Sequence, residues 1–315
     1  MKRKIKIYLE DFWFPITEKA IKDFALYRIL SKRFDLEITK NPDFLIYSAM
    51  SRNYLKYNCV RIYYTGENTR PNFNECDYAF SFDYPVTERN YRLPLYKTYL
   101  DSFDIVKNSA RDVNSIISEG RKFCNFLYSN KRAKIRNDFF HSLSQYKSID
   151  SGGKVLNNLG YFVDDKHEFL RNYKFTIAFE NEAYPGYTTE KILHAFAADS
   201  IPIYWGNPLV DRDFNPKSFI NCNDYGSFEE VIDKIIEIDN NDDLYRQYLN
   251  EPAFTDNVEN EYVNEENILN RFEEIFKNQG IEKVARKTDI LKYYKHIIKY
   301  NIKETRRKIR KLISS

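Results

Sequence analysis

Cysteine is scarce in this 315-residue sequence. The four cysteines, Cys59, Cys76, Cys124 and Cys222, are scattered and show no C-x-x-C spacing. This distribution supplies neither the paired ligands of a zinc site nor the framework of a disulfide-rich domain. We therefore interpret the cysteines as small apolar side chains that fill the core.

Long apolar runs are also missing. No segment reaches the roughly 20 consecutive apolar residues that a membrane-spanning helix needs. The beginning of the chain, MKRKIKIYLE, becomes an alternating strand before the apolar core of a signal peptide appears. We therefore expect a cytoplasmic protein.

Glycine-rich phosphate-binding fingerprints are absent as well. Neither G-x-G-x-x-G nor G-x4-G-K-[ST] occurs, which argues against a dinucleotide-dependent enzyme and against an ordinary phosphate-loop nucleoside triphosphatase. No internal repeat or low-complexity tract stands out. Apolar residues make up 43% of the chain and aromatic residues 17%, a composition typical of a globular protein.

Strand-like and helix-like segments alternate along the chain, which predicts an α/β fold with parallel sheets. The expected strands are 5–9, 36–39, 44–47, 60–64, 78–82, 123–128, 175–179 and 201–205. The expected helices are 17–33, 133–146, 165–172, 228–239, 244–249 and 261–277. The length suits two domains of about 150 residues each. Because the periodicity weakens between residues 100 and 121, we place the domain boundary there.

The stretch from Tyr173 to Gly206 organises the second half of the chain. It reads as a buried strand, a loop with a Pro185-Gly186 break, a helix that begins near Thr188, and a second strand. Ligands of open α/β sheets bind beyond the carboxyl ends of the strands, and a helix N-terminus there attracts anions. Lys191 adds a full positive charge, so an anionic ligand would fit. The alternative is an ordinary solvated strand end and first helical turn.

Several motifs in this stretch and before it occur together. FEN-x4-GY-x-TEKI, at residues 179–192, is followed by IPIYWG and by DFNPKSFI at residues 213–220. YYTGEN, RLPLY and KIRNDFF precede them in order, beginning at Tyr63, Arg92 and Lys134. Together the motifs resemble the signature of the bacterial α-1,3/4-fucosyltransferases, glycosyltransferase family 10, and they cover roughly residues 1–275.

The resemblance implies a GT-B architecture, in which two Rossmann-like domains face each other across a cleft. It implies an acceptor-binding domain at residues 1–110 and a GDP-fucose-binding domain at residues 111–280, followed by a basic amphipathic tail at residues 281–315. It also implies that Glu67, in the GEN motif just past an expected strand, is the general base that deprotonates the acceptor hydroxyl. A carboxylate suits that role because burial can raise its pKa toward neutrality. For this residue alone, the alternative is a solvated glutamate in a turn.

The resemblance further implies a set of donor-binding residues. Arg136 and Lys191 would neutralise the diphosphate, whose charge grows as the glycosidic bond breaks. Glu190 would accept hydrogen bonds from the ribose, and Tyr187 would flank the nucleotide. Glu180 and Asn181 would line the fucose end. For Glu180, the alternative is a polar strand end without a role in binding.

The sequence gives little indication of a metal site. Asp211-Arg212-Asp213 reads as D-x-D, a pattern with which other glycosyltransferases hold a divalent cation. It runs into the DFNPKSF stretch, however, and Arg136 with Lys191 already supplies positive charge. No paired ligand spacing occurs among the four histidines, His141, His167, His194 and His296. We expect no tightly bound cofactor and no required divalent metal, with GDP-fucose as the donor substrate.

The C-terminus differs in composition from the rest of the chain. Residues 286–315 hold eleven Lys and Arg against two acidic residues, so this tail carries +9 and residues 1–285 carry −6. On a helical wheel one broad apolar face is formed by Ile290, Tyr294, Ile297, Ile298, Ile302, Ile309 and Leu312. Such a helix favours an anionic membrane surface, with roughly 1 kcal/mol per basic residue near the lipid. The alternative is a helix that is solvated or packed on the body. Nucleic-acid binding is not expected, because no recognition fold accompanies the tail.

Taken together, the motifs indicate an inverting fucosyltransferase. GDP-β-L-fucose would donate to the 3-hydroxyl of GlcNAc in a β-1,4-galactosyl-GlcNAc acceptor, giving Lewis x-type glycans on a bacterial surface polysaccharide or lipopolysaccharide. The tail would place the protein peripherally on the inner membrane. The alternatives are a transferase with another acceptor, at the 4-hydroxyl or on glucose, one with another nucleotide sugar, or a non-catalytic glycan- or membrane-binding protein. The heptad repeats that some bacterial members carry are missing, so the oligomeric state is left open.

Overall fold

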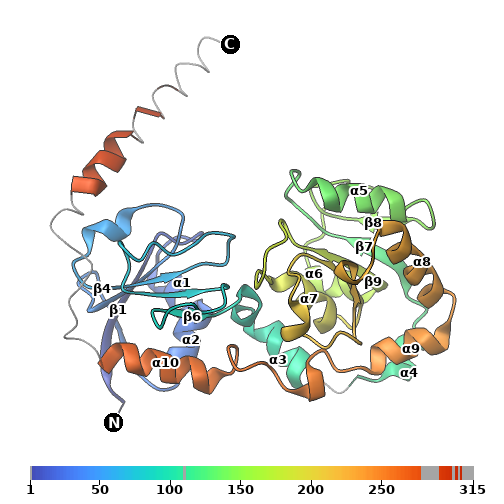
Figure 1. The fold of residues 1–315 in the computed structure, drawn as a ribbon, viewed down its shortest axis with the longest axis horizontal. Helices are drawn as coiled ribbons and strands as arrows, with labels where there is room; N and C mark the ends of the chain where they lie inside the picture. The colour runs from blue at the N-terminus through green and yellow to red at the C-terminus, as the bar shows by residue number, and fades with distance from the viewer. Residues whose placement is uncertain (1, 109–110, 278–290, 300–301, 304–305, 307–315) are drawn as a thin grey trace. The chain divides into compact units, whose positions relative to one another are not determined.

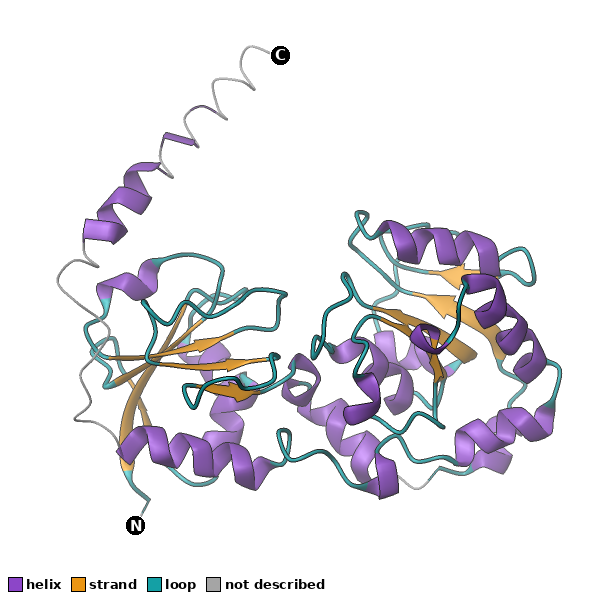
Figure 2. Cartoon of the chain, viewed as in Figure 1, coloured by secondary structure: helices purple, strands orange, loops and turns teal. Residues whose placement is uncertain are grey.

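The structure is a computed structural model that describes residues 2–108, 111–277, 291–299, 302–303 and 306. The chain forms two compact units (Figure 1). The first comprises residues 1–81, 85–93 and 265–315, and the second comprises residues 82–84 and 94–264. Each unit is an α/β structure built on one parallel sheet (Figure 2).

The sheet of the first unit has six strands in the order β2-β1-β3-β4-β5-β6, and every neighbouring pair is parallel. The strands are β1 (Lys4–Glu10), β2 (Asp35–Ile38), β3 (Phe44–Tyr47), β4 (Val60–Tyr64), β5 (Tyr78–Ser81) and β6 (Asn90–Arg92). β3 and β4 are buried along their whole length, as expected of central strands that are covered on both faces. The order reverses between β1 and β3, and such a switch point opens a crevice at the carboxyl edge of a parallel sheet.

The helix expected over residues 17–33 is two helices, α1 (Glu18–Asp23) and α2 (Ala25–Ser31). They are separated at Phe24, whose backbone is extended (φ −68°, ψ 135°). The Phe24 ring packs edge-on against Phe12 and Tyr64, with centroids 5.1 and 5.6 Å away. The predicted helix is therefore interrupted where the Phe24 ring packs against residues of other segments. The spacing of apolar residues in the sequence does not show this interruption. A 3-10 turn, η1 (Asn53–Lys56), precedes β4.

The last long helix, α10 (Glu265–Lys277), returns to the first unit. Its buried face includes Phe272, which stacks on Phe80 at 4.2 Å between centroids, and Phe276, which lies 4.7 Å from Phe44. The units therefore divide differently from the domains expected at residues 1–110 and 111–280. The apolar face of α10 completes the core of a sheet that lies far away in sequence.

The sheet of the second unit has five parallel strands in the order β11-β10-β9-β7-β8. The strands are β7 (Lys122–Phe126), β8 (Ile149–Ser151), β9 (Tyr173–Phe179), β10 (Ile201–Trp205) and β11 (Ile220–Asn221). The helices are α3 (Leu100–Asn108), α4 (Val113–Ser118), α5 (Lys134–Leu143), α6 (Lys166–Arg171), α7 (Glu190–Ala197), α8 (Phe228–Asp239) and α9 (Asp242–Asn250). The weakly patterned segment 100–121, where we placed the domain boundary, contains α3 and α4 and lies within the second unit, which takes up the chain from residue 94. The strand order reverses between β7 and β9.

Short 3-10 turns complete the second unit. They are η2 (Leu95–Thr98), η3 (Val210–Arg212), η4 (Cys222–Asp224) and η5 (Thr255–Asn257). All four cysteines are buried and free, which confirms the interpretation of these residues as core side chains.

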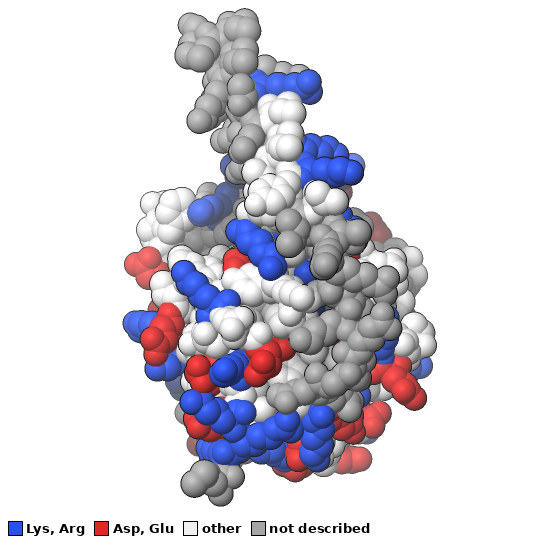
Figure 3. Space-filling view, turned by 90° about the vertical axis from the view of Figure 1, so that its left-hand side faces the viewer, with Lys and Arg blue, Asp and Glu red and all other residues white. Residues whose placement is uncertain are grey.

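Part of the basic tail is described, and residues 291–299 are helical. Tyr293 packs against a hydrophobic cluster of the first unit, and Lys56 lies 4.6 Å from the centre of its ring. Lys side chains lie along the described part of this helix beside uncharged ones (Figure 3). Ile290, Ile309 and Leu312, which belong to the expected apolar face, lie outside the described residues. Within the described ranges, no helix combines the length and hydrophobicity needed to cross a membrane.

Candidate active site

The carboxyl ends of β9 and β10 bring the predicted donor residues of the second unit together. Phe179 and Trp205 are register partners at the ends of these strands, so Glu180 and Gly206 follow side by side. The φ of Gly206 is +153°, and a Cβ at this position would lie 2.5 Å from Cγ of Glu180. Glycine is therefore required here, because the Glu180 side chain runs directly across the backbone of the neighbouring strand end.

Glu180 directly follows β9, and its buried carboxylate lies at the N-terminus of α7. It accepts hydrogen bonds from the backbone N–H of Thr189 (2.7 Å) and from Thr189 Oγ1 (2.7 Å). Nζ of Lys191 lies 2.9 Å from Oε2 of Glu180. The sequence predicted an anionic ligand at the N-terminus of α7, and in the structure the carboxylate of Glu180 occupies this position. In this structure the Glu180 carboxylate is engaged by Thr189 and Lys191.

Lys191 lies within reach of two carboxylates. Its Nζ is 3.8 Å from Oε1 of Glu190, and it donates to Thr189 Oγ1 at 2.7 Å. Burial opposes the charged form, but Glu180 and Glu190 outweigh it and raise the pKa of Lys191. Burial likewise opposes ionisation of Glu190, yet Lys191, followed by Lys166, lowers the pKa of that carboxyl. Both residues are therefore charged at neutral pH.

Arg136, on α5, approaches the same region from the carboxyl side of β7. Its guanidinium carbon lies 3.6 Å from the centre of the Tyr128 ring, and Nη2 donates to the carbonyl of Asn130 at 2.8 Å. Nη1 makes long contacts of 3.4 Å with Asn181 Oδ1 and 3.5 Å with the carbonyl of Phe179. Burial lowers the pKa of Arg136. Among the described residues its buried Nε has no hydrogen-bond partner, so donor capacity remains at the switch point between β7 and β9.

Tyr187 lies in the loop before α7 and is buried. Its ring packs edge-on against Phe82, with centroids 5.0 Å apart. Next to it Gly186 has φ +84°, and a Cβ there would lie 2.5 Å from the carbonyl oxygen of Phe82. The loop is therefore fixed by close packing on residues 82–84, and the role of Tyr187 beside a nucleotide stays a prediction.

Glu67 belongs to the first unit, where it follows β4 in an exposed turn. Thr65 Oγ1 accepts from the backbone N–H of Glu67 at 3.0 Å, and the carbonyl of Glu67 accepts from the N–H of Thr69 at 2.7 Å. Tyr63 OH lies 2.6 Å from Thr69 Oγ1. A hydrogen-bonded turn therefore presents the Glu67 side chain to solvent at the carboxyl edge of the sheet. The burial that was expected to suit this carboxylate to its role is not found within the first unit, and the role of Glu67 as a base stays a prediction.

The D-x-D sequence has a structural role at its second acid. Asp213 is buried and accepts hydrogen bonds from Tyr96 OH (3.2 Å), Thr188 Oγ1 (3.1 Å) and Asn260 Nδ2 (2.9 Å). Its carboxylate ties the loop before α7 to two other segments. Across the described ranges of the chain, no group of three or more His, Cys, Asp or Glu side chains is arranged to hold a metal ion.

Two titratable residues near Glu190 have shifted pKa values that sequence reasoning did not predict. Burial lowers the pKa of Lys166, at the start of α6, while Glu190 acts in the opposite direction. Burial and then the charge of Lys166 lower the pKa of His194, on α7, to about 3. Nothing in the local sequence around Lys166 signals this, because its interactions are with residues 14 or more positions away.

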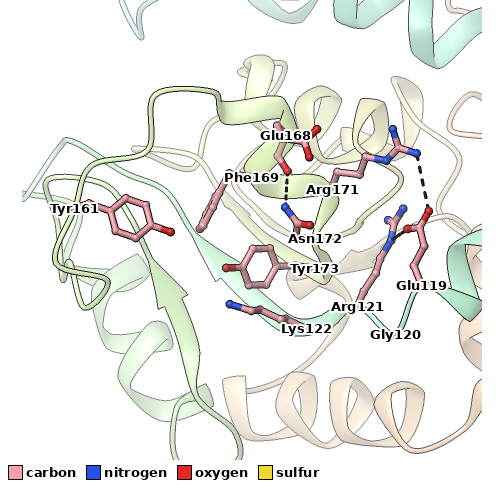
Figure 4. Close-up of a pocket in the computed structure, with 10 residues that line it drawn as sticks. All are labelled: Glu119, Gly120, Arg121, Lys122, Tyr161, Glu168, Phe169, Arg171, Asn172 and Tyr173. Carbon is pink, nitrogen blue, oxygen red and sulfur yellow. Dashed lines mark hydrogen bonds and ion pairs between the residues drawn. The ribbon is translucent and has the colours of Figure 1, made fainter.

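A separate pocket of about 660 Å³ lies at the opposite edge of the second sheet. Lys122 and Tyr173, the first residues of β7 and β9, line it together with Tyr161, Glu168 and Arg171 (Figure 4). Ligands of open parallel sheets bind at the carboxyl ends of the strands. This pocket is therefore not part of the candidate active site.

The fold and the site define a class of protein. A parallel α/β unit with buried cations at its switch point is suited to a phosphorylated nucleotide ligand, and a second parallel unit presents a carboxylate at a strand end. Two such units are the components of a GT-B type glycosyltransferase.

Sequence comparisons identify the family. Residues 7–99 match the N-terminal domain of alpha-(1,3)-fucosyltransferase FucT, and residues 117–299 match the C-terminal region of glycosyltransferase family 10 (fucosyltransferase). The chain therefore belongs to glycosyltransferase family 10, which confirms the resemblance seen in its motifs.

Individual relatives agree with this assignment. Alpha-(1,3)-fucosyltransferase FucT of Helicobacter pylori is 35% identical over 78% of this chain and 60% of its own length. A putative fucosyltransferase of Acanthamoeba polyphaga mimivirus is 27% identical over 88% of this chain and 47% of its own length. The chain thus spans about half to three fifths of these curated relatives.

Solved structures give a similar result. A crystal structure of an α1,3-fucosyltransferase with GDP-fucose has a TM-score of 0.76 and 31% identity, covering 90% of this chain and 93% of that one. A crystal structure of an α1,3-fucosyltransferase with GDP has a TM-score of 0.77 and 32% identity, covering 90% and 94%. These likenesses confirm the α/β fold of GT-B type.

Proposed function

We propose that the protein is an inverting α-1,3-fucosyltransferase that moves L-fucose from GDP-β-L-fucose to the 3-hydroxyl of GlcNAc in a β-1,4-galactosyl-GlcNAc acceptor. The observation that carries the donor half is the buried Arg136 together with Lys191, whose side chain is 14% exposed, in a chain whose fold matches an α1,3-fucosyltransferase crystallised with GDP-fucose. The buried Nε of Arg136 has no hydrogen-bond partner among the described residues, and such unused donor capacity favours an anionic ligand.

Each donor residue has a role in this proposal. Arg136 and Lys191 bind the diphosphate and stabilise the charge that develops on it during bond cleavage. Glu190 accepts from the ribose hydroxyls, and Tyr187 flanks the nucleotide. Asn181 lines the fucose end next to Arg136. Glu180, whose carboxylate already accepts from Thr189 and pairs with Lys191, holds the lysine in position at that same end.

The reaction is a direct displacement. The acceptor oxygen forms a bond to C1 of fucose while the bond from C1 to the β-phosphate oxygen breaks, and GDP leaves with the electron pair of that bond. Glu67 takes the proton of the attacking hydroxyl. Inversion at C1 converts the β-linked donor into an α-linked product, and no tightly bound cofactor or divalent metal takes part.

The acceptor would be part of a bacterial surface polysaccharide or lipopolysaccharide, giving Lewis x-type glycans. A related transferase with another acceptor or another nucleotide sugar is the second candidate. A non-catalytic glycan- or membrane-binding protein is the third. The presence of Glu67, Arg136, Glu190 and Lys191 together favours an active enzyme over both a decayed scaffold and a simple binding module.

The decisive experiment measures GDP release from GDP-fucose by purified protein in the presence of EDTA. We expect release that depends on N-acetyllactosamine, and much less release with the β-1,3-linked isomer, whose 3-hydroxyl is already substituted. GDP binding without release on any acceptor would refute the transferase function. Release that requires added Mg²⁺ or Mn²⁺ would refute metal independence.

Variants separate the proposed roles. Glu67→Gln should abolish turnover while GDP affinity stays within about twofold, because the base does not touch the nucleotide. Glu88→Gln, which changes another exposed carboxylate of the first unit, is the matched control and should keep full activity. Arg136→Ala and Lys191→Ala should each weaken GDP binding as well as rate. Unchanged GDP affinity in both would contradict contact with the diphosphate.

We also propose that the protein is cytoplasmic and that its basic tail, residues 286–315, binds it peripherally to the anionic surface of the inner membrane. Supporting this, Leu291, Tyr294 and Ile298 of the described helix are 62%, 59% and 59% exposed. Spaced at three and four residues, they share a face that apolar lipid could cover, and Lys295 and Lys299 lie beside them.

Liposome sedimentation tests the membrane proposal. The full chain should bind vesicles that contain anionic lipid and dissociate at high salt, whereas a chain without residues 286–315 should stay in solution and keep its activity. Ile298→Asp should weaken binding, and Val86→Asp, at an apolar residue that is 97% exposed in the first unit, should not. Equal binding by the full and shortened chains would refute the anchor.

A further inference from the structure

An aromatic cluster lies beyond the carboxyl end of β1. Phe12 is buried, stacks on Tyr64 at 6.0 Å between centroids, and meets Phe24 edge-on at 5.1 Å. Trp13 packs on the same group, with its ring 5.7 Å from Phe14 and nearly perpendicular to it. Unlike Phe12, Trp13 is 48% exposed. The cluster therefore supports a large, partly solvated indole ring.

The loop that carries Trp13 is held in place by backbone geometry and by hydrogen bonds. Asp11 adopts a left-handed conformation (φ 59°), which turns the chain immediately after β1. Its Oδ2 accepts from the backbone N–H of Tyr54 at 2.9 Å, and its carbonyl accepts from the N–H of Met50 at 3.1 Å. The loop after β1 is thus tied to the loop after β3. Trp13 is presented by an ordered segment rather than by a free loop.

This position is the switch point of the first sheet. β1 and β3 are adjacent but lead to opposite halves of the sheet, and a crevice forms beyond the carboxyl ends of such strands. In the register of the sheet, Glu10 pairs with Tyr47, and Tyr47 pairs with Tyr63. The loops that follow β1 and β4 therefore start at the same level, two strand spacings or about 10 Å apart.

Glu67 lies on the second of these loops. Tyr64, the last residue of β4, has its ring 6.3 Å from that of Trp13, and Glu67 follows three residues later. The exposed indole and the exposed carboxylate therefore project from neighbouring loops of one sheet edge. A substrate whose reacting hydroxyl meets Glu67 would extend from there across the crevice toward Trp13.

We infer that Trp13 is the platform on which a hexose ring of the acceptor stacks, next to the sugar that reacts at Glu67; this rests on the proposed transferase function. One face of a hexose ring is lined with C–H groups of slightly positive character, and the face of an indole ring is electron-rich. Stacking covers apolar surface on both partners, and the indole N–H can donate to a sugar oxygen. Trp13 is thus an acceptor-binding residue that sets specificity, and it takes no part in the chemistry.

The tryptophan content of the chain permits a direct binding test, because Trp13 and Trp205 are the two tryptophans in the sequence. In a Trp205→Phe variant, Trp13 is the sole indole fluorophore. Titration with N-acetyllactosamine in the presence of GDP should shift its emission to shorter wavelength and saturate, because the sugar displaces water from the ring. Sucrose, a disaccharide of similar size, is the control and should leave the emission unchanged.

Kinetics give a second readout. Trp13→Ala should raise the acceptor KM about tenfold, a change equivalent to about 1.4 kcal/mol, while the KM for GDP-fucose and the release of GDP without acceptor stay within twofold. Trp13→Tyr should recover most of the loss, because it keeps an aromatic face. Phe162→Ala, at a 64% exposed aromatic residue of the second unit, is the matched control and should behave as the unmodified protein.

The outcomes distinguish this inference from the proposed function. Suppose that the enzyme is active, that Trp13→Ala leaves the acceptor KM unchanged, and that Trp13 emission does not change when acceptor is added. This result overturns the inference and leaves the proposed function intact. A saturable emission change without turnover supports the inference and refutes the reaction. A loss of kcat and thermal stability in Trp13→Ala with unchanged KM would assign Trp13 a structural role and overturn the inference.

Discussion

Acid should destabilise the second unit through one histidine. The ring of His194 packs edge-on against Tyr99 with centroids 4.9 Å apart, and its buried Nδ1 has no hydrogen-bond partner among the described residues. Burial, followed by the charge of Lys166, lowers its pKa from an ordinary 6.5 to about 3. The folded protein therefore keeps His194 neutral at pH values where the unfolded chain binds a proton.

The sign and size of the effect follow from linkage. Because the unfolded state binds more protons, the stability due to neutral His194 is complete above pH 6.5 and is lost as the pH falls toward 3. Between pH 8 and pH 5 the free energy of unfolding should fall by about 2 kcal/mol from this residue. For a unit of 150–250 residues, that corresponds to a melting temperature roughly 4–8 °C lower.

The first unit should respond to acid in the opposite direction. Burial raises the pKa of Asp11 from 3.8 to about 6, so the folded first unit binds a proton before the unfolded chain does. Its contribution to stability is present below pH 3.8 and is lost as the pH rises through 6. Acidification from pH 8 to 5 should therefore add about 1 kcal/mol there.

Tryptophan fluorescence can follow the two units separately. Trp13→Phe leaves Trp205 to report urea unfolding of the second unit, and Trp205→Phe leaves Trp13 to report on the first. Adding His194→Phe should remove most of the loss between pH 8 and pH 5 in the second unit, while His141→Gln, at an exposed position on α5, should not. An equal loss with and without His194 would refute the reasoning.

Three further substitutions probe packing and charge. Glu180→Gln removes the buried partner of Lys191 and should lower stability by about 3 kcal/mol; GDP should raise the melting temperature more in this variant than in the unmodified protein, and a smaller rise would contradict contact between Lys191 and the diphosphate. Gly206→Ala should cost about 2–3 kcal/mol in urea unfolding, because its Cβ would lie 2.5 Å from Glu180, and a neutral result would argue against that close approach. Phe272→Ala should cost about 3–5 kcal/mol, seen by Trp13 fluorescence, since the ring stacks on Phe80 inside the first unit; a change seen only by Trp205 would place α10 in the second.

Much of the sheet architecture could be predicted because its central strands are marked locally. β3 and β4 are short apolar runs bounded by turn residues, and β10 follows a helix with a clear apolar face. The short strands β6 and β8 were missed because three residues carry too little pattern. Their existence depends on the neighbouring strand that supplies the hydrogen bonds.

Elements that depend on distant packing were the least predictable. The break at Phe24 accompanies an aromatic cluster that includes residues from two other segments. The return of α10 to the first sheet depends on Phe80 and Phe44, which lie about 200 positions earlier in the chain. An amphipathic pattern shows that α10 needs a partner surface, but it does not show which one.

The site could be predicted as a set of residues but not as an arrangement. The motifs predicted that Arg136, Asn181 and Lys191 belong to the donor site, and the structure brings them to one sheet edge within the second unit. That Glu180 fills the N-terminus of α7 could not be read from the sequence, because it depends on Gly206 allowing a close approach between two strand ends. The interactions of Lys166 with Glu190 and His194 depend in the same way on how α6 packs against α7.

The charges at this edge suggest why a buried carboxylate belongs in a site for an anion. Arg136, Lys166 and Lys191 interact electrostatically with Glu180, and the two lysines also interact with Glu190. Without Glu180 the desolvated lysine would lose its main partner and would be costly to keep charged and in place. With Glu180 present, Lys191 keeps a carboxylate partner 2.9 Å away, which holds its Nζ in place and raises its pKa. A diphosphate then meets cations that are already oriented, which is the condition under which charge developing on the leaving group is stabilised most effectively.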